Sequence, residues 1–303
     1  MTDTPAENEI RTDLRPTGLL QPENKRALSA LIALGEKRIA DAEKHAAAIP
    51  DSPMIDRAWK LLLRGLLLVG RLDLNEAELC LLQACSLAFI HGRQGENEVD
   101  SDALRLCARA LHHIGWIYRR QDRPDDAYRT HMTAHRLREQ YGSFEELWET
   151  AIELGLDADV ARRHEDARRW QRAAIAAAER ASIEPARKRA IAWTDLATSF
   201  AESGEHDEAV AAAGTARDWW REHDIGAAEA ALADLTLATA LLKQGEALHE
   251  RNDERTRPVL TEAVKWLTTA RNALLAFGQA HTADAEQARE QKDFAERLLA
   301  SFG

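Results

Sequence analysis

The chain of 303 residues is long enough to bury a sizeable hydrophobic core, and 56 of its residues are Ala, whereas Tyr and Phe together number only 9. Many good helix formers and few β-branched or aromatic residues favour an all-helical protein and exclude a β-sandwich, a doubly wound sheet or a disordered chain. The formal net charge of −11 argues against a nucleic-acid binder, because neutralisation of phosphates by Lys and Arg supplies most of the non-specific affinity.

The first half of the chain contains clear start and stop signals for helices. Residues 1–21 are acidic and polar, lack the apolar core of a signal peptide and are expected to form a disordered tail. Residues 22–50 are expected to form one packing helix. Proline and capping residues then predict four further helices, over residues 53–70, 75–91, 101–121 and 124–142.

The second half continues in the same way. Ser143 and Glu146 form a capping box that predicts the start of a helix. Pro185 and Gly204 delimit a later helix, and Gly226 and Gly245 are interpreted as breaks between the helices that follow. Residues 282–303 are expected to form a last helix with a wet outer face, which caps the array. No segment alternates with a period of two, so no strand is expected.

A repeated frame decides the architecture. In one copy Leu111, Ile114, Gly115 and Tyr118 lie on one helix face, and Ala127 follows where a second helix needs a small side chain. Similar copies are centred on Gly65, Gly155, Ala197 and Leu237–Leu241. The marker alanines that follow are spaced by 50, 40, 42 and 54 residues, at positions Ala77, Ala127, Ala167, Ala209 and Ala263.

This frame resembles the tetratricopeptide repeat over about residues 54–277, in the extended form with repeats of about 40 residues found in kinesin light chains and bacterial peptide-sensing regulators. The resemblance implies an all-α, right-handed solenoid with five helix-turn-helix pairs over residues 51–281. It also implies an interaction scaffold, in which the first helix of each pair lines a concave groove that takes a peptide or a partner helix.

The groove positions of the first pair are too apolar to face water: Trp59, Leu62, Leu66 and Val69. We therefore expect the segment 22–50 to cover them. On the fourth and fifth pairs the corresponding positions are small or apolar and carry no charge: Thr194, Thr198, Ala201, Leu235, Thr239 and Leu242. We expect this part of the groove to be shallow and to hold apolar side chains of a partner.

The groove positions of the second pair form one stripe of basic and aromatic residues: Arg109, His112, Trp116 and Arg119. Two guanidinium groups beside an indole and an imidazole suit an acidic partner or a C-terminal carboxylate. The alternative is an internal, salt-bridged interface, in which Glu149 and Asp159 from the equivalent positions of the next pair neutralise the two arginines. The residues leave both readings open.

Catalysis and metal binding find little support. The chain lacks the nucleophile-elbow, phosphate-loop and dinucleotide-binding motifs, and no cofactor is expected. His131 and His135 share a helix face but lack the glutamate and third ligand of a zinc hydrolase. Cys80, Cys85 and Cys107 form no CxxC pair and are expected to be buried apolar side chains in a reducing cytoplasm.

The sequence thus predicts a cytoplasmic, non-enzymatic scaffold for a protein or peptide partner, without a nucleic-acid or membrane partner. The main alternative is a self-assembling homo-oligomer that pairs through its terminal helices or through Trp219 and Trp220, and an unrecognised enzyme is the third. Trp193 is expected in the core. Whichever reading holds, the residues do not identify the partner.

Overall fold

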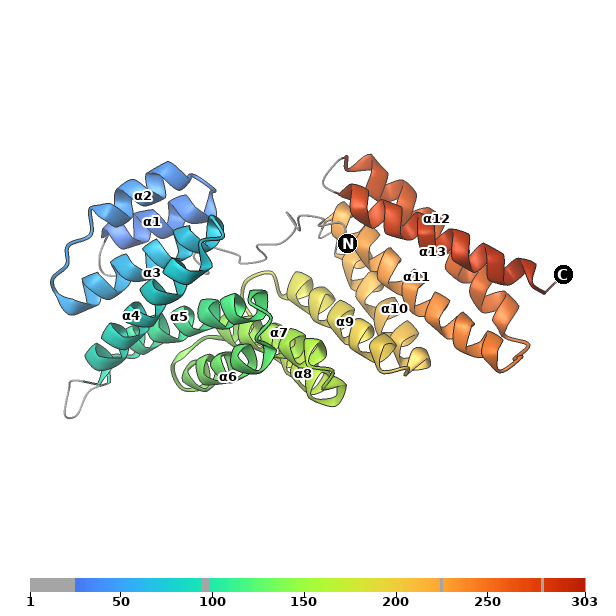
Figure 1. The fold of residues 1–303 in the computed structure, drawn as a ribbon, viewed down its shortest axis with the longest axis horizontal. Coiled ribbons are helices and arrows are strands. Elements are labelled where there is room, and N and C mark those ends of the chain that lie inside the picture. Colours follow the sequence, from blue (N-terminus) through green and yellow to red (C-terminus); the bar gives the residue numbers. More distant parts are fainter. Residues whose placement is uncertain (1–24, 94–98, 224–225, 279–280, 303) are drawn as a thin grey trace. The chain divides into compact units, whose positions relative to one another are not determined.

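A computed structural model describes residues 25–93, 99–223, 226–278 and 281–302, and these form thirteen α-helices and no strand (Figure 1). The assumed tail over residues 1–21 lies outside the described residues. The helices are α1 (Lys25–Gly35), α2 (Ile39–Ala47), α3 (Met54–Gly70), α4 (Leu74–Gly92), α5 (Ser101–Arg120), α6 (Pro124–Tyr141), α7 (Phe144–Val160), α8 (His164–Arg180), α9 (Pro185–Glu202), α10 (His206–Glu222), α11 (Ala227–Glu250), α12 (Thr256–Ala276) and α13 (Thr282–Ala300).

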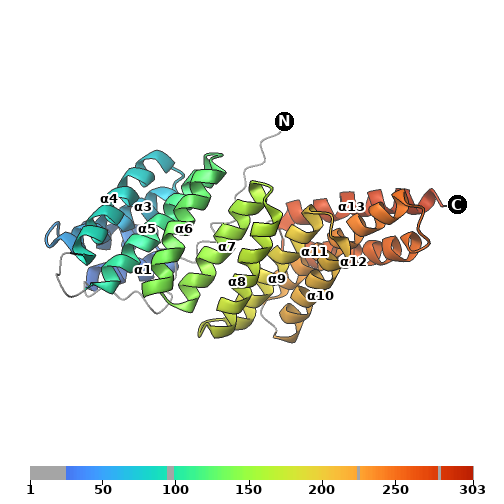
Figure 2. The same cartoon turned by 90° about the horizontal axis from the view of Figure 1, so that it is seen from below.

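The chain divides into two compact units, Met1–Asp157 and Ala158–Gly303. In the first unit, consecutive helices from α1 to α6 pack against one another. In the second unit, the same holds from α8 to α13, and Figure 2 shows α11, α12 and α13 lying side by side. The predicted class, an all-α solenoid of tetratricopeptide-like pairs, is confirmed. The five predicted pairs would correspond to consecutive helices, from α3/α4 to α11/α12.

Every turn within a pair has the same backbone motif. One residue adopts the left-handed conformation, with φ of 60° at Leu72, 58° at Asp122, 56° at Arg162 and 52° at Asn252, and 81° at Gly204. The next N–H then bonds to the carbonyl five residues back, as from Asp73 to Leu68. This geometry satisfies carbonyls at the end of the first helix and reverses the chain.

The N-terminal segment is itself a helix pair, so the single helix expected over residues 22–50 is wrong. The helix ends at Gly35, Lys37 takes the left-handed conformation with φ of 57°, and Arg38 N–H bonds to Ala33 O at 2.8 Å. The left-handed position of this turn is occupied by Lys37 and not by glycine, so the residue itself does not mark a turn in the sequence. The motif matches the turns within the five predicted pairs.

The N-terminal pair covers α3, as expected. Both α1 and α2 contact α3, and the apolar positions Trp59, Leu62, Leu66 and Val69 are buried in a core that also contains Leu31 and Ile49. At the other end, α13 packs on α11 and α12 through Ala285, Ala288 and Ala295, whose side chains are buried. The opposite residues of α13 are exposed, as expected of a capping helix.

Glycines of the first helices receive large side chains from the second helices. A Cβ at Gly65 would lie 2.7 Å from the Leu81 side chain, and one at Gly245 would lie 2.4 Å from that of Leu260. Gly245 therefore lies inside α11 and does not end it, contrary to the sequence interpretation. The frame of the last pair is thus centred on Gly245, and not on Leu237–Leu241.

Other local expectations have mixed outcomes. The capping box is confirmed, because Ser143 N–H bonds to Glu146 Oε2 at 3.0 Å and Glu146 N–H bonds to Ser143 Oγ at 3.3 Å.

Cys80 is a free buried cysteine, as expected. Cys85 and Cys107, in contrast, form a disulfide between α4 and α5. The expectation of three unbonded cysteines is wrong because the packing of two helices, and not a short sequence spacing, brings these sulfur atoms together.

Candidate binding surface

The six predicted site residues fall into two groups, one in each unit. Thr194 and Thr198 lie on α9 in the second unit, whereas the basic and aromatic stripe lies on α5 in the first unit. Each group is therefore described with the residues of its own unit.

The α9 threonines present a neutral surface. Thr194 is half-buried and Thr198 is exposed. Their hydroxyl groups donate to the carbonyls of Ala190 and Thr194 at 2.9 and 3.1 Å, one helical turn back. Because the hydroxyls are already bonded to their own helix, the side chains offer mainly methyl groups to a partner.

The neighbouring helix α11 extends this surface toward α13. Helix α11 contacts both α9 and α13. Lys243 on α11 donates to the Glu202 carboxylate on α9 at 2.8 Å, and this bond lowers the pKa of Glu202. We call the aligned helices α9, α11 and α13 the first-helix row of the second unit.

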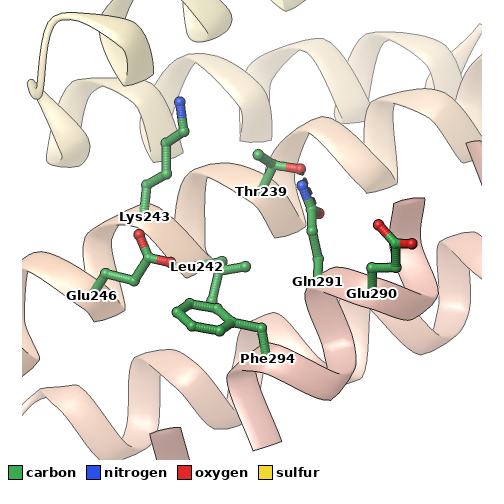
Figure 3. A pocket seen from close by; sticks show the side chains of 7 residues that line it. All are labelled: Thr239, Leu242, Lys243, Glu246, Glu290, Gln291 and Phe294. Atoms are coloured by element: carbon green, nitrogen blue, oxygen red, sulfur yellow. Dashed lines mark hydrogen bonds between the residues drawn. The ribbon is translucent and has the colours of Figure 1, made fainter. Parts of the chain in front are cut away.

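A hollow of 290 Å³ opens between α11 and α13 (Figure 3). Its lining combines apolar, polar and charged side chains: Thr239, Leu242, Lys243, Glu246, Glu290, Gln291 and Phe294. The Thr239 hydroxyl lies 3.0 Å from Gln291 Oε1, so the two helices are linked at the edge of the hollow. Burial raises the pKa of Glu246.

The hollow has the chemistry of a side-chain pocket. Phe294 is 36% exposed, although it lies on the side of the capping helix that faces α11. The Gln291 amide NH2 has no acceptor among the described residues, so it is available to a partner's backbone carbonyl. An apolar side chain of a peptide would rest on Leu242 and Phe294, with its main chain bonded to Gln291.

Two predicted groove positions on α11 are largely buried, although one of them, Leu242, lines the hollow. Leu235 and Leu242 are 6% and 5% exposed, and they belong to the cores formed with α12 and α13. The capping helix packs partly on the groove positions of α11, which the repeat pattern alone does not show. Gln291 and Phe294 of α13 were not predicted as binding residues, and the exposed aromatic ring on a capping helix is the one signal that would have indicated them.

The α5 stripe of the first unit is mostly buried. Arg109, His112 and Trp116 are 9%, 7% and 6% exposed. Burial lowers the pKa of Arg109, opposed in part by the nearby Glu149 carboxylate, and burial also lowers the pKa of His112 well below 6.5. These three side chains offer little surface to a ligand.

Arg119 is bound to two carboxylates of α7. Its guanidinium contacts Glu153 and donates to Asp157 Oδ1 at 2.7 Å. Burial acts to lower the pKa of Arg119, but the two carboxylates raise it overall. The geometry favours the internal, salt-bridged interpretation of the stripe, although the carboxylates on Arg119 come from Glu153 and Asp157 and not from Asp159.

His131 connects this ion pair to α5. Its Nε2 donates to the His112 carbonyl at 2.9 Å, and its Nδ1 lies 2.5 Å from Asp157 Oδ2. The ring packs directly on Gly115. The His131 side chain is 0% exposed.

The tryptophans give little support to the self-assembly surface that the sequence suggested. Trp220 is 4% exposed, and Trp219 stacks on His223 with Arg189 over its ring. Trp193, which was expected in the core, is half-buried and packs against the core of the second unit. It lines a second hollow, of 460 Å³, between α8, α9 and α10.

Among the residues placed by the structure, no three His, Cys, Asp or Glu side chains gather as metal ligands would. Within the same ranges, every helix is too short or too polar to cross a lipid bilayer.

No protein-family model matches the chain, and no curated protein matches its sequence. Solved structures do match. The apo form of RapI has a TM-score of 0.57 at 9% identity, with 91% of this chain and 98% of that chain covered. A putative kinesin light chain repeat protein from Podosopora anserina has a TM-score of 0.56 at 13% identity, with 74% and 98% covered.

A third match is the Rap conjugation gene regulator of the plasmid pLS20 in complex with the Phr* peptide, with a TM-score of 0.51 at 14% identity over 92% of this chain and 75% of that chain. At such low identity these likenesses establish the fold alone. Together with the repeated turns and helix pairs, they show that the chain has a fold of the tetratricopeptide-repeat type.

Proposed function

We propose that the chain is a non-enzymatic scaffold that binds a peptide or a partner helix along the first-helix row of its second unit. The observation that carries the proposal is the hollow between α11 and α13, which has an apolar floor and a free amide donor and lies beside the neutral threonine face of α9. A protein of the same fold was solved in complex with a peptide, which supports this use of the architecture.

The row also indicates what kind of segment it binds. Leu242 and Phe294 form the floor of the hollow, and the methyl groups of Thr194 and Thr198 continue the neutral surface. Of the described residues that line the hollow, Lys243 is the one cation, and it is already paired with Glu202, whereas Glu246 and Glu290 also line the hollow. A partner segment with an apolar anchor and neutral or basic flanking residues fits these charges. The acidic partner proposed for the α5 stripe would need a different surface.

A peptide selection tests the proposal without knowledge of the partner. Random twelve-residue peptides displayed on phage are selected on the full chain, and recovered peptides are synthesised for titration. Thr198→Arg and Thr239→Arg each place a long cation on the row. We expect both variants to weaken binding of the selected peptides at least tenfold, because the added side chains occupy the space that the peptide needs.

Thr261→Arg is the matched control, because Thr261 is exposed on α12 and its hydroxyl also bonds to a carbonyl one turn back, that of Arg257 at 2.8 Å. This variant is expected to bind with the affinity of the wild type. Equal binding by all three variants would place the site elsewhere, and a selection that enriches no peptide would contradict the scaffold function.

A further inference from the structure

Helix α4 carries an exposed apolar stripe. Twelve consecutive residues, from Leu79 to Ile90, include no charged side chain. Four large apolar residues of this segment lie within about 100° of one another around the helix. Their exposed fractions are 61% for Leu79, 40% for Leu82, 41% for Phe89 and 48% for Ile90.

The opposite face of α4 is already packed. Ala77, Leu81, Ala84 and Ala88 are 0% exposed, in the core of the first unit, where α4 contacts α3 and α5. A helix that is apolar on all sides is normally buried on all sides. One face of α4 therefore lacks the cover that its composition calls for.

Helix α6, the second helix of the next pair, carries charged side chains at positions that correspond to the α4 stripe. The marker alanines Ala77 and Ala127 differ by 50 residues, so Leu79 and Phe89 correspond to Arg129 and Glu139 of α6. The α6 residues are exposed and charged. The apolar stripe is thus specific to α4 and is not a property of every second helix in the array.

We propose that the α4 stripe is the interface between two copies of this chain, with the two α4 helices packed antiparallel. The ends of the stripe carry opposite charges, because Glu76, which also pairs with Arg64 of α3, precedes it and Arg93, whose guanidinium lies over the Phe89 ring, follows it. A twofold axis through the middle of the stripe places Leu79 on Ile90 of the second copy. The same register places Arg93 beside Glu76 of the second copy, because Arg93 lies three residues after Ile90 and Glu76 lies three residues before Leu79.

The antiparallel arrangement is complementary in two ways. It joins each acidic end to a basic end, whereas a parallel arrangement would place like charges together. It also opposes the two helix dipoles. Ser86 is exposed near the middle of the stripe, and its small side chain allows the helices to approach closely. The stripe therefore complements itself, which is the requirement for a twofold interface.

The interface is small. Four large side chains from each copy bury less than the area of a standard, stable complex, so we expect a dimer with a dissociation constant in the micromolar range. Sedimentation velocity of the full chain, from about 2 to about 200 µM, measures this directly. The mass is expected to rise with concentration from that of the 33.8 kDa monomer toward twice that value.

Substitutions in the α4 stripe test whether the chain dimerises through this surface or through another one. The double variant Leu79→Glu and Ile90→Glu is expected to stay monomeric over the whole range. Leu275→Glu is the matched control, because Leu275 on α12 is 49% exposed and lies in the other unit. Circular dichroism of all variants checks that the helices remain, which we expect because the substituted side chains are exposed.

A charge exchange tests the register. Arg93→Glu and Glu76→Arg are each expected to weaken dimerisation at least threefold, and the two together are expected to restore it. A wild-type chain that remains monomeric at the highest concentration would overturn the proposal, as would a dimer that the stripe variant leaves intact. A dimer abolished by the stripe variant but not restored by the charge exchange would overturn the antiparallel register.

Discussion

Arg119 holds two carboxylates with little access to water, and this arrangement makes it a structural cation of the first unit. The Asp157 side chain is 0% exposed and that of Glu153 is 16% exposed. The stripe to which Arg119 belongs was a candidate anion site, and its buried neighbours and paired guanidinium favour a structural role. Binding and stability measurements on one variant separate the two readings.

Arg119→Ala is expected to lower the free energy of unfolding by about 2–4 kcal/mol, because it leaves buried carboxylates without their cation. Urea unfolding followed by circular dichroism measures the loss. Arg289→Ala is the control, since this arginine pairs with Glu286 and Asp293 on the exposed surface of α13, where an ion pair contributes little. If Arg119→Ala keeps the stability of the wild type but no longer binds an acidic peptide, the structural role of Arg119 is contradicted and the α5 stripe is a ligand site.

His112 and His113 make the first unit sensitive to acid. Burial lowers the pKa of both imidazoles well below 6.5, and Arg138 and Arg109 nearby lower it further. Below pH 6.5 the unfolded chain therefore takes up protons that the folded chain does not. The free energy of unfolding is expected to fall with decreasing pH, by about 1.4 kcal/mol per pH unit for each imidazole.

Urea titrations at pH 7.5, 6.5 and 5.5 check this dependence. His113→Gln is expected to flatten it, whereas His223→Gln, at an exposed ring on Trp219, is expected to leave it unchanged. Equal stability of the wild type at pH 7.5 and 5.5 would show that the two imidazoles do not control the response.

At the scale of the helices, the sequence predicts the pairs well because their markers are local. A small residue in the first helix, followed at a set distance by a marker alanine in the second helix, is enough to establish the repeated frame. The prediction fails where a distant partner decides the outcome. Gly245 resembles a break until Leu260 is seen packed on it, and the turn after Gly35 has Lys37, and not glycine, at its left-handed position.

For the candidate site too, local spacing can be predicted from the sequence, whereas contacts with distant helices cannot. Spacing alone puts the α5 stripe and the α9 threonines on first-helix faces. Whether those positions reach solvent depends on other helices: α7 supplies carboxylates to Arg119, and α13 packs on Leu235 and Leu242 of α11. Such contacts join residues far apart in the chain, which periodicity within one helix cannot reveal.

Gly115 is expected to tolerate no side chain. A Cβ at this position would lie 2.5 Å from His131 Nε2, and the ring cannot move away without losing its bonds to His112 and Asp157. Gly115→Ala should therefore lower the free energy of unfolding by about 1–3 kcal/mol. Gly214→Ala is the matched control in α10, where a Cβ meets no atom within 4 Å.

The control should gain up to about 1 kcal/mol from the higher helix propensity of Ala. Thermal and urea unfolding of the two variants give the comparison. Equal stability of Gly115→Ala and the wild type would mean that the contact between the helices is not close enough to require glycine.

At the scale of the whole molecule, the two units combine one architecture with different surfaces. The first unit buries its stripe and exposes an apolar face on α4, whereas the second unit keeps a neutral first-helix row with a hollow at its end. Among the described residues, two buried clusters of the second unit are formed by side chains from α8 to α13. Binding and self-association would then depend on different units and should be separable by mutation.

Removal of the N-terminal pair tests this separation. A chain that begins at residue 50 loses α1 and α2 and exposes the buried apolar positions of α3, namely Trp59, Leu62, Leu66 and Val69. At about 1.5–3 kcal/mol for each side chain, the loss of about 6–12 kcal/mol is comparable to the stability of a typical domain. The first unit should therefore unfold or aggregate, while the second unit keeps its own transition in differential scanning calorimetry.

A chain that ends after residue 281 is the reciprocal variant. It loses α13, whose Ala285, Ala288 and Ala295 pack in the cores of the second unit, and it should lower the transition of that unit alone. It should also lose the selected peptides, because Gln291 and Phe294 are removed with the helix. If the chain that begins at residue 50 instead melts at the wild-type temperature, the N-terminal pair does not stabilise α3, and its place in the core of the first unit would be wrong.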